Sequence, residues 1–245
     1  MSKTLILIPS RMSASRLPGK PLLKIGGKSI ISHVYLAAKD TNIGDTFVAT
    51  EDEEIYNNIK EINGNAILTN KARTGSDRIY AAYKKLNLKD IDYILNIQGD
   101  EPFIDKESLI NLNNHSIKNN LKISTLASQI KNIDDYKNES IVKVSTNDKI
   151  NLNKPSKAKY FFRNIDNKKY DNIYHHIGIY LYEVSTLEKF FNLAQTTNEK
   201  KMKLEQLRFI DNNINIDVYF TKQSPIGIDT KEDYLRAKIL MESKN

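Results

Sequence analysis

An alternation of apolar strands and amphipathic helices in the first part of the chain is the strongest constraint on the fold. Four runs with the composition of buried strands lie at Thr4–Pro9, Asp45–Thr50, Ala66–Leu68 and Asp92–Gln98. Between them, apolar side chains recur at helical spacing from Ile30, Ile55 and Ile79. This alternation predicts βαβ units. We therefore expect an α/β fold with a mixed, mostly parallel sheet and helices on both faces.

The pattern changes after about Asp105. Strand-like runs follow at Ile123–Ile130, Ile141–Ser145, Lys159–Phe162, His176–Tyr182 and Ile214–Thr221. Three helices are expected: one from Ser185 with a capping box completed by Glu188, one over roughly Glu199–Phe209, and one after Thr230 with a capping box completed by Asp233. We expect this part to add a smaller mixed subregion to the same domain.

Length and residue usage exclude several classes of protein. The 245 residues suit one domain, and the absence of cysteine excludes disulfides, thiol catalysis and cysteine-based zinc sites. The first apolar run is too short for a signal peptide, and no stretch approaches the length that spans a bilayer. We expect a cytoplasmic protein without membrane insertion.

The net charge of +7 is positive but dispersed. A basic chain can attract nucleic acid, an anionic membrane or a polyanionic small substrate. Here the charge is mostly lysine scattered along the sequence, without a basic cluster interleaved with aromatic residues. A nucleic-acid partner is therefore not expected, and salt-sensitive binding to DNA or RNA would be its signature.

The segment after the first strand has the composition of a phosphate-binding loop. It reads IPSRMSASRLPGKPL and offers three cations, Arg11, Arg16 and Lys20, together with serine hydroxyls and Gly19. Arginine guanidinium groups and a lysine ammonium can bind the oxygens of a triphosphate, and a glycine lets the backbone approach the phosphates closely. The loop lacks the glycine patterns of a Walker A motif and of a dinucleotide fingerprint.

This loop resembles the N-terminal signature of the 3-deoxy-manno-octulosonate (Kdo) cytidylyltransferases, also called CMP-Kdo synthetases. Other segments resemble motifs of that family, in family order: Thr74–Arg78 (TGSDR), Asn96–Pro102 (NIQGDEP), Val142–Val144 (VKV), His176–Tyr180 (HIGIY), Leu204–Arg208 (LEQLR) and Gly227–Thr230 (GIDT). The resemblance implies a Rossmann-like nucleotide-diphospho-sugar transferase fold in a single domain, 1–245. It implies a nucleotide-binding core at about 1–130 and 210–245, and a sugar-binding and dimerisation subregion at about 131–209 that builds a homodimer.

The activity implied by the resemblance is Mg²⁺-dependent transfer of CMP from CTP to the anomeric hydroxyl of Kdo, for lipopolysaccharide biosynthesis. Asp100 and Asp229 would hold the metal, since hard oxygen ligands suit Mg²⁺; the alternative for Asp229 is a helix N-cap. The CTP-binding residues would be Pro9, Arg11, Ser15, Arg16, Lys20, Thr74, Ser76, Arg78 and Asp100, with Arg11, Lys20 and Asp100 as the catalytic set. Arg16 is alternatively paired with a carboxylate, and Arg78 is alternatively a helix-surface residue.

The resemblance also implies a set of sugar-binding residues: Gln98, Arg163, His176, Tyr180, Glu205 and Gln206. Arg163 can bind a carboxylate through two parallel hydrogen bonds from its guanidinium group. His175 and His176 are adjacent on a strand, so only one of them faces the site, and the motif favours His176. The family usually has YFSRAxIP where this chain has YFFRNID from Tyr160, so the arginine is kept while the serine and proline are not.

Two alternatives of different class stay open. One is a cytidylyltransferase for another sugar acid, such as 8-amino-Kdo or a nonulosonate. The other is a catalytically silent nucleotide-binding module. A module of that kind has no need of both Asp100 and Asp229, and pyrophosphate release from CTP with a panel of sugar acids separates these possibilities.

Overall fold

The computed structural model describes residues 2–13, 16–164, 170–223 and 227–243. The chain divides into two compact units, one formed by residues 1–110 and 225–245 and the other by residues 111–224. Within the described residues, no helix is long and apolar enough to cross a membrane. The functional division expected at about 130 and 210 stays a prediction.

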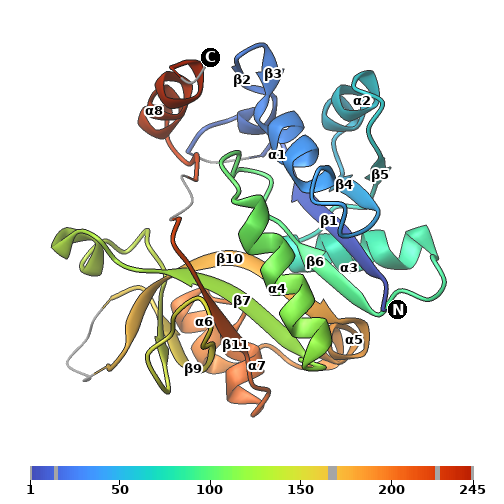
Figure 1. Cartoon of the computed structure of the whole chain (residues 1–245). Helices are drawn as coiled ribbons and strands as arrows, with labels where there is room; N and C mark the ends of the chain where they lie inside the picture. Colours follow the sequence, from blue (N-terminus) through green and yellow to red (C-terminus); the bar gives the residue numbers. More distant parts are fainter. Residues whose placement is uncertain (1, 14–15, 165–169, 224–226, 244–245) are drawn as a thin grey trace. The chain divides into compact units, whose positions relative to one another are not determined.

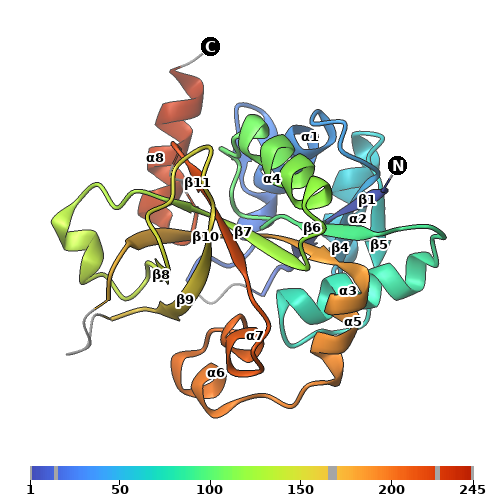
Figure 2. The same ribbon diagram turned by 60° about the horizontal axis from the view of Figure 1, so that its bottom comes forward.

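The first unit contains the expected parallel sheet. Its strands lie in the order β5 (Ala66–Leu68), β4 (Thr46–Thr50), β1 (Thr4–Ser10) and β6 (Tyr93–Asn96), and every pairing among them is parallel. Helices α1 (Ile30–Lys39), α2 (Glu53–Glu61) and α3 (Gly75–Leu86) connect successive strands, and α1 and α3 cover opposite faces of the sheet (Figure 2). The strand order reverses between β1 and β6, which is where α/β sheets of this kind bind ligands.

The end of the chain packs against the start of the first unit. Helix α8 (Lys231–Glu242) lies beside the hairpin of β2 (Lys24–Ile25) and β3 (Lys28–Ser29), as Figure 1 shows. Ile25 and Ile228 are fully buried in one apolar cluster, and the Tyr234 hydroxyl donates to the Lys24 carbonyl at 2.7 Å. Thr230 and Asp233 form the capping box predicted for this helix. The packing holds Asp229 at the N-terminal end of α8.

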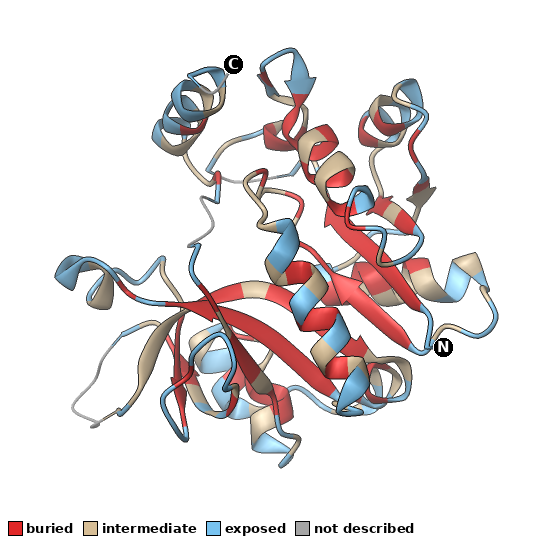
Figure 3. Cartoon of the chain, in the orientation of Figure 1, coloured by how far each residue is buried: buried red, intermediate tan, exposed pale blue. Residues whose placement is uncertain are grey.

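The second unit is a closed barrel with mostly antiparallel pairing, so the prediction that the main sheet of the domain is mostly parallel is wrong. Strands β7 (Ile123–Ser128), β8 (Lys143–Thr146), β9 (Ser156–Phe162), β10 (Ile173–Glu183) and β11 (Asp217–Thr221) pair in the ring β10-β7-β11-β9-β8-β10. The pairing of β7 with β11 is parallel, and the other pairings of the ring are antiparallel. In each unit the strands are largely buried while the outer helix faces are exposed (Figure 3).

Two helix predictions in the later part of the chain are corrected, and one helix was not predicted. Helix α5 (Val184–Asn192) has Glu183 at its N-cap position, with no side-chain capping hydrogen bond, because β10 runs directly into the helix and leaves Ser185 inside the first turn. The helix expected over 199–209 is two helices, α6 (Thr197–Met202) and α7 (Leu207–Asp211), separated where Lys203 adopts a φ of 53°. Helix α4 (Lys106–Lys118) was not expected, because buried polar residues such as Asn113 and Ser116 interrupt its apolar pattern.

Candidate functional site

The loop after β1 is folded so that its lysine points inward. The Met12 amide donates to Asp52 at 2.8 Å, and the Gly19 amide donates to the Met12 carbonyl at 3.2 Å. Gly19 has a φ of 70°, a left-handed conformation that glycine adopts without strain. This turn leads into the short 3₁₀ helix η1 (Lys20–Leu22), whose first residue, Lys20, is buried.

The loop after β6 approaches the end of β1 closely at Gly99. A side-chain β-carbon at this position would lie 2.8 Å from the Pro9 carbonyl oxygen, so a larger residue would push the loop away from the strand. The Asp100 carbonyl in turn accepts a hydrogen bond from the Ile228 amide at 3.0 Å. The carboxyl edge of the sheet therefore brings together three residues that are distant in the sequence: Ser10, Asp100 and Asp229.

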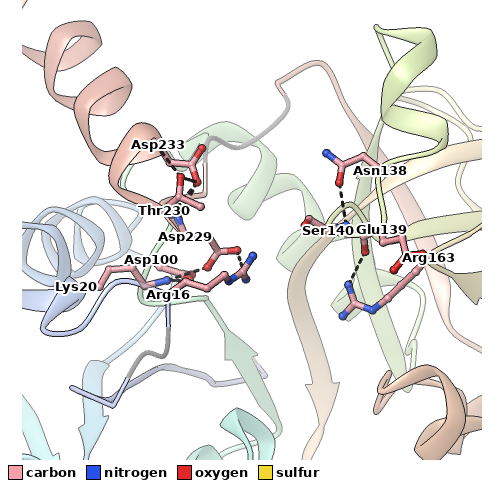
Figure 4. A network of polar contacts seen from close by, with 10 residues as sticks. All are labelled: Arg16, Lys20, Asp100, Asn138, Glu139, Ser140, Arg163, Asp229, Thr230 and Asp233. Atoms are coloured by element: carbon pink, nitrogen blue, oxygen red, sulfur yellow. Dashed lines mark hydrogen bonds and ion pairs between the residues drawn. The ribbon is translucent and has the colours of Figure 1, made fainter.

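Lys20 lies between the two carboxylates that were predicted as metal ligands. Its Nζ is 2.6 Å from Asp100 Oδ2 and 3.1 Å from Asp229 Oδ1 (Figure 4). Burial opposes the lysine charge, but Asp100 and Asp229 outweigh this effect and raise the pKa of Lys20 above its ordinary value. Arg16 Nη2 lies 2.8 Å from the second oxygen of Asp229, which is the pairing with a carboxylate that the sequence left open.

A pocket of about 310 Å³ opens at this edge of the first unit. Its volume falls in the range of small-molecule sites. Nine of the predicted site residues line it: Pro9, Arg11, Arg16, Lys20, Thr74, Arg78, Gln98, Asp100 and Asp229. Ser76 is buried in the first turn of α3 and is not among the lining residues, and Ser15 falls outside the described residues.

Arg78 is a buried partner of an acidic residue that the sequence analysis missed. Its side chain is 2% exposed, so the interpretation as a helix-surface residue is wrong. Arg78 Nη2 lies 3.2 Å from Glu51 Oε2, and Nη1 donates to Thr69 Oγ1 at 3.2 Å. Glu51 Oε2 also accepts from the Ala72 amide at 3.3 Å. The pair thus fixes the loop that leads to Thr74. The sequence feature that could have indicated Glu51 is its position as an acidic residue immediately after β4.

Glu101 is a second acidic residue outside the predicted set. Its Oε2 is buried and has no hydrogen-bonding partner within the described residues. Burial is the largest cause that raises the pKa of this carboxyl to about 8, and the negative charges of Asp100 and Asp229 add to it. The site therefore concentrates acidic groups at the pocket, with Asp100 and Asp229 lining it and Glu101 buried behind them, and Lys20 partly offsets their charge.

The donor chemistry of Asp100 and Asp229 fits a hard divalent cation. Both are carboxylates, and a lysine ammonium bonded to both already shows that positive charge is favoured between them. Within the described residues, no three His, Cys, Asp or Glu side chains gather closely enough to hold a metal ion by themselves. An ion held here would need further ligands from a bound molecule or from water. The alternative of Asp229 as the N-cap is wrong, because Thr230 caps α8.

The remaining predicted sugar-binding residues belong to the second unit. His176 is 7% exposed on β10, and its Nε2 lies 3.1 Å from Thr125 Oγ1, a hydroxyl that is also within hydrogen-bonding distance of the Ile177 carbonyl at 3.1 Å and the Ile179 carbonyl at 2.7 Å. Burial, with a smaller contribution from His175, lowers the pKa of His176 to about 3. The ring of Tyr180 lies 5.4 Å from that of His176, and burial raises the pKa of its hydroxyl well above the ordinary value.

The backbone of Arg163 is held by a buried cation. The Lys143 side chain is fully buried, and its Nζ donates to the Arg163 and Asn138 carbonyls at 2.6 Å each. The Arg163 guanidinium donates to the Glu139 carbonyl at 2.9 Å (Figure 4). Glu205 and Gln206 are half-buried between α6 and α7.

The junction between α6 and α7 is locked by a buried ion pair. Arg208 donates to both carboxylate oxygens of Glu199, and its guanidinium carbon lies 4.1 Å from the centre of the Phe190 ring. The same Glu199 closes a capping box with Thr196 at the start of α6. Neither Arg208 nor Lys143 was among the predicted site residues, although both belong to quoted motifs, LEQLR and VKV.

Comparison with known proteins agrees over nearly the whole chain. The sequence pattern of the cytidylyltransferase family matches residues 5–216. A 3-deoxy-manno-octulosonate cytidylyltransferase from Parabacteroides distasonis is 37% identical, with all of both chains covered. Another from Thermodesulfovibrio yellowstonii is 39% identical over 94% of each chain.

Solved structures show the same likeness. The structure of a CMP:2-keto-3-deoxy-manno-octonic acid synthetase complexed with CTP superposes with a TM-score of 0.88 at 32% identity, covering all of both chains. A 4-diphosphocytidyl-2C-methyl-D-erythritol synthase from Anaerococcus prevotii has a TM-score of 0.63 at 16% identity, covering 98% of this chain and 99% of that one, and shares the fold alone. The full-length identities, the family pattern and the close superposition together show that this chain belongs to the 3-deoxy-manno-octulosonate cytidylyltransferase family.

Proposed function

We propose that this protein transfers CMP from CTP to the anomeric hydroxyl of Kdo, giving CMP-Kdo and pyrophosphate for lipopolysaccharide biosynthesis. The observation that carries the proposal is the meeting of Lys20, Asp100 and Asp229 in the pocket of the first unit. A nucleotidyl transfer needs cations for the departing pyrophosphate and carboxylates for a metal ion, and this pocket supplies both. Membership in the family gives the acceptor class.

The cations of the β1 loop would bind the triphosphate. Arg11 and Arg16 are exposed at the pocket, where their guanidinium groups can form charge-assisted hydrogen bonds to phosphate oxygens. Lys20 would neutralise the charge that grows on pyrophosphate as it leaves. The likeness to a synthetase complexed with CTP supports CTP as the nucleotide.

Asp100 and Asp229 would hold Mg²⁺, whose octahedral shell is commonly completed by phosphate oxygens and water. When bound, the metal would supply charge stabilisation at the reacting phosphate. The protein's own contribution is to fix the two carboxylates: Asp100 follows β6, and Asp229 is held by the packing of α8. In-line attack by the sugar hydroxyl then depends on how the two substrates are positioned.

Gln98, which lines the pocket of the first unit, would be one of the residues that bind the sugar acid. The roles of Arg163, His176, Tyr180, Glu205 and Gln206, all in the second unit, in binding the sugar acid stay predictions. Arg163 would bind the carboxylate of the sugar. His176 is neutral at physiological pH because its pKa is low, so its role would be hydrogen bonding rather than charge. A homodimer formed through the second part of the chain stays a prediction.

The acceptor is tested by comparing kcat/KM for Kdo, its 8-amino analogue and N-acetylneuraminate at one concentration of CTP and Mg²⁺. Kdo should be preferred, because a site built around one set of hydroxyl groups rejects a sugar that leaves them unpaired. Preference for the 8-amino analogue would favour the runner-up acceptor. Equal or better use of N-acetylneuraminate would overturn the acceptor and leave nucleotidyl transfer standing.

A further inference from the structure

The two proposed metal ligands are already neutralised by cations of the protein. Lys20 Nζ bonds to both Asp100 and Asp229, and Arg16 bonds to the remaining oxygen of Asp229. The charges of this cluster of four residues therefore cancel. Figure 4 shows the lysine side chain reaching the two carboxylates.

The position of Lys20 conflicts with simultaneous metal binding. Mg²⁺ binds carboxylate oxygens at about 2.0–2.1 Å. The ammonium lies 2.6 Å from Asp100 Oδ2, so an ion bound between the carboxylates would lie within a few ångströms of it. At such distances like charges repel strongly, and more so where burial lowers the effective dielectric constant, as it does at this side chain of 10% exposure.

We propose that the Lys20 ammonium holds the place of the metal ion between Asp100 and Asp229 until a bound triphosphate draws the ammonium away. The idea rests on the proposed function of this site. The triphosphate offers Lys20 new anionic partners, which leaves the carboxylates to the divalent ion. Metal and nucleotide therefore bind with positive coupling, and the nucleotide-free protein has low affinity for a divalent ion at this position.

The test measures the affinity for Mn²⁺ in the absence of nucleotide. The concentration of free Mn²⁺ is monitored by its electron paramagnetic resonance signal. The whole chain is compared with Lys20→Met and Lys20→Gln, which remove the positive charge. Both variants should bind one Mn²⁺ at least tenfold more tightly than the unsubstituted protein. Lys24→Met removes an exposed lysine nearby on β2 and should leave the affinity unchanged.

A double variant locates the ion. Adding Asp100→Asn to Lys20→Met should return Mn²⁺ affinity to the low value of the unsubstituted protein, because one carboxylate is lost. Tight Mn²⁺ binding by the unsubstituted protein, or tight binding that survives Asp100→Asn, would overturn the proposal. Neither measurement involves CTP or a sugar acid, so the outcome is separate from that of the proposed reaction.

A measurement on the unsubstituted protein covers the case in which the variants fail to fold. In nuclear magnetic resonance spectra selective for ¹⁵N-labelled lysine side chains, CTP with a chelator should shift the Lys20 ammonium signal. Millimolar Mg²⁺ alone should leave that signal in place. Displacement of the signal by Mg²⁺ alone, or no effect of CTP, would contradict the place-holding role.

Discussion

The Glu51 carboxylate lies 3.2 Å from the guanidinium of Arg78 and also accepts the amide of Ala72. One ion pair, in which the arginine is buried and the glutamate partly buried, thus connects the end of β4, helix α3 and the loop that lines the pocket. Removing one partner of such a pair leaves the other charge poorly compensated. The shape of this side of the pocket therefore depends on a residue that does not itself line it.

Glu51→Gln should raise the KM for CTP by roughly tenfold, equivalent to about 1.4 kcal/mol, while the KM for the sugar acid changes little. Without the ion pair, the loop up to Thr74 is less well ordered, and part of the binding free energy is spent on ordering it when the nucleotide binds. Steady-state kinetics in both substrates measure the effect. Glu54→Gln, at an exposed position of α2, is the matched control. An unchanged KM for CTP in Glu51→Gln would show that the ion pair has no part in nucleotide binding.

Asp100→Asn should lower kcat by roughly a hundredfold or more, because a neutral amide is a poor Mg²⁺ ligand. CTP affinity measured by calorimetry without metal should not weaken, because the substitution also releases Lys20 from Asp100. Retention of more than about a tenth of normal kcat at saturating Mg²⁺ would remove Asp100 from the metal site.

Arg11→Ala should raise the KM for CTP and lower kcat, together by roughly tenfold to a hundredfold in kcat/KM. The arginine is exposed at the pocket and would contact phosphate oxygens whose charge grows in the transition state. Arg73→Ala is the control, since that side chain is 75% exposed and does not line the pocket. A variant with normal CTP kinetics and a poor KM for the sugar acid would mean that the loop faces the other substrate.

His176 should make the protein less stable in mild acid. Its pKa of about 3 in the folded protein is below the ordinary value of 6.5, so the unfolded chain takes up the proton first. The contribution of neutral His176 to the free energy of unfolding is therefore fully present above pH 6.5, and it is lost progressively as the pH falls from 6.5 towards 3. One such group costs about 2 kcal/mol between pH 8 and pH 5.

Urea unfolding of the whole chain and of His176→Gln at both pH values isolates this contribution, because the other titrating groups are shared. The difference in unfolding free energy between pH 8 and pH 5 should be about 2 kcal/mol smaller in the variant. An identical pH dependence in the two proteins would contradict the assignment of the low pKa to His176.

The alternating pattern of the first unit was predictable because each segment carries its own period. The parallel strands β1, β4, β5 and β6 all occur at the expected places. The barrel of the second unit was not predictable in the same way, because periodicity identifies a strand but not its partner. Nothing local to β8 indicates that it pairs with both β9 and β10 and so closes the ring.

The site residues were likewise predictable where a sequence motif contains them, and not where their role depends on a contact made by the fold. Lys20 and Asp100 were found by motif, and the structure adds that they are bonded to each other. Arg78 was found as a cation, but its pairing with Glu51 depends on a contact between α3 and the end of β4. Lys143 and Arg208 lie in quoted motifs but were missed as site residues, because a motif does not show that its cation is buried and held by carbonyl oxygens or by one carboxylate.

Product formation tests the central claim most directly. The whole chain is incubated with CTP, Kdo and Mg²⁺, and the products are followed by ³¹P nuclear magnetic resonance. The account predicts CMP-Kdo and pyrophosphate in equal amounts, formed only when Kdo is present and abolished by a chelator. Release of pyrophosphate that does not depend on Kdo, or no CMP-Kdo from a folded protein, would contradict it.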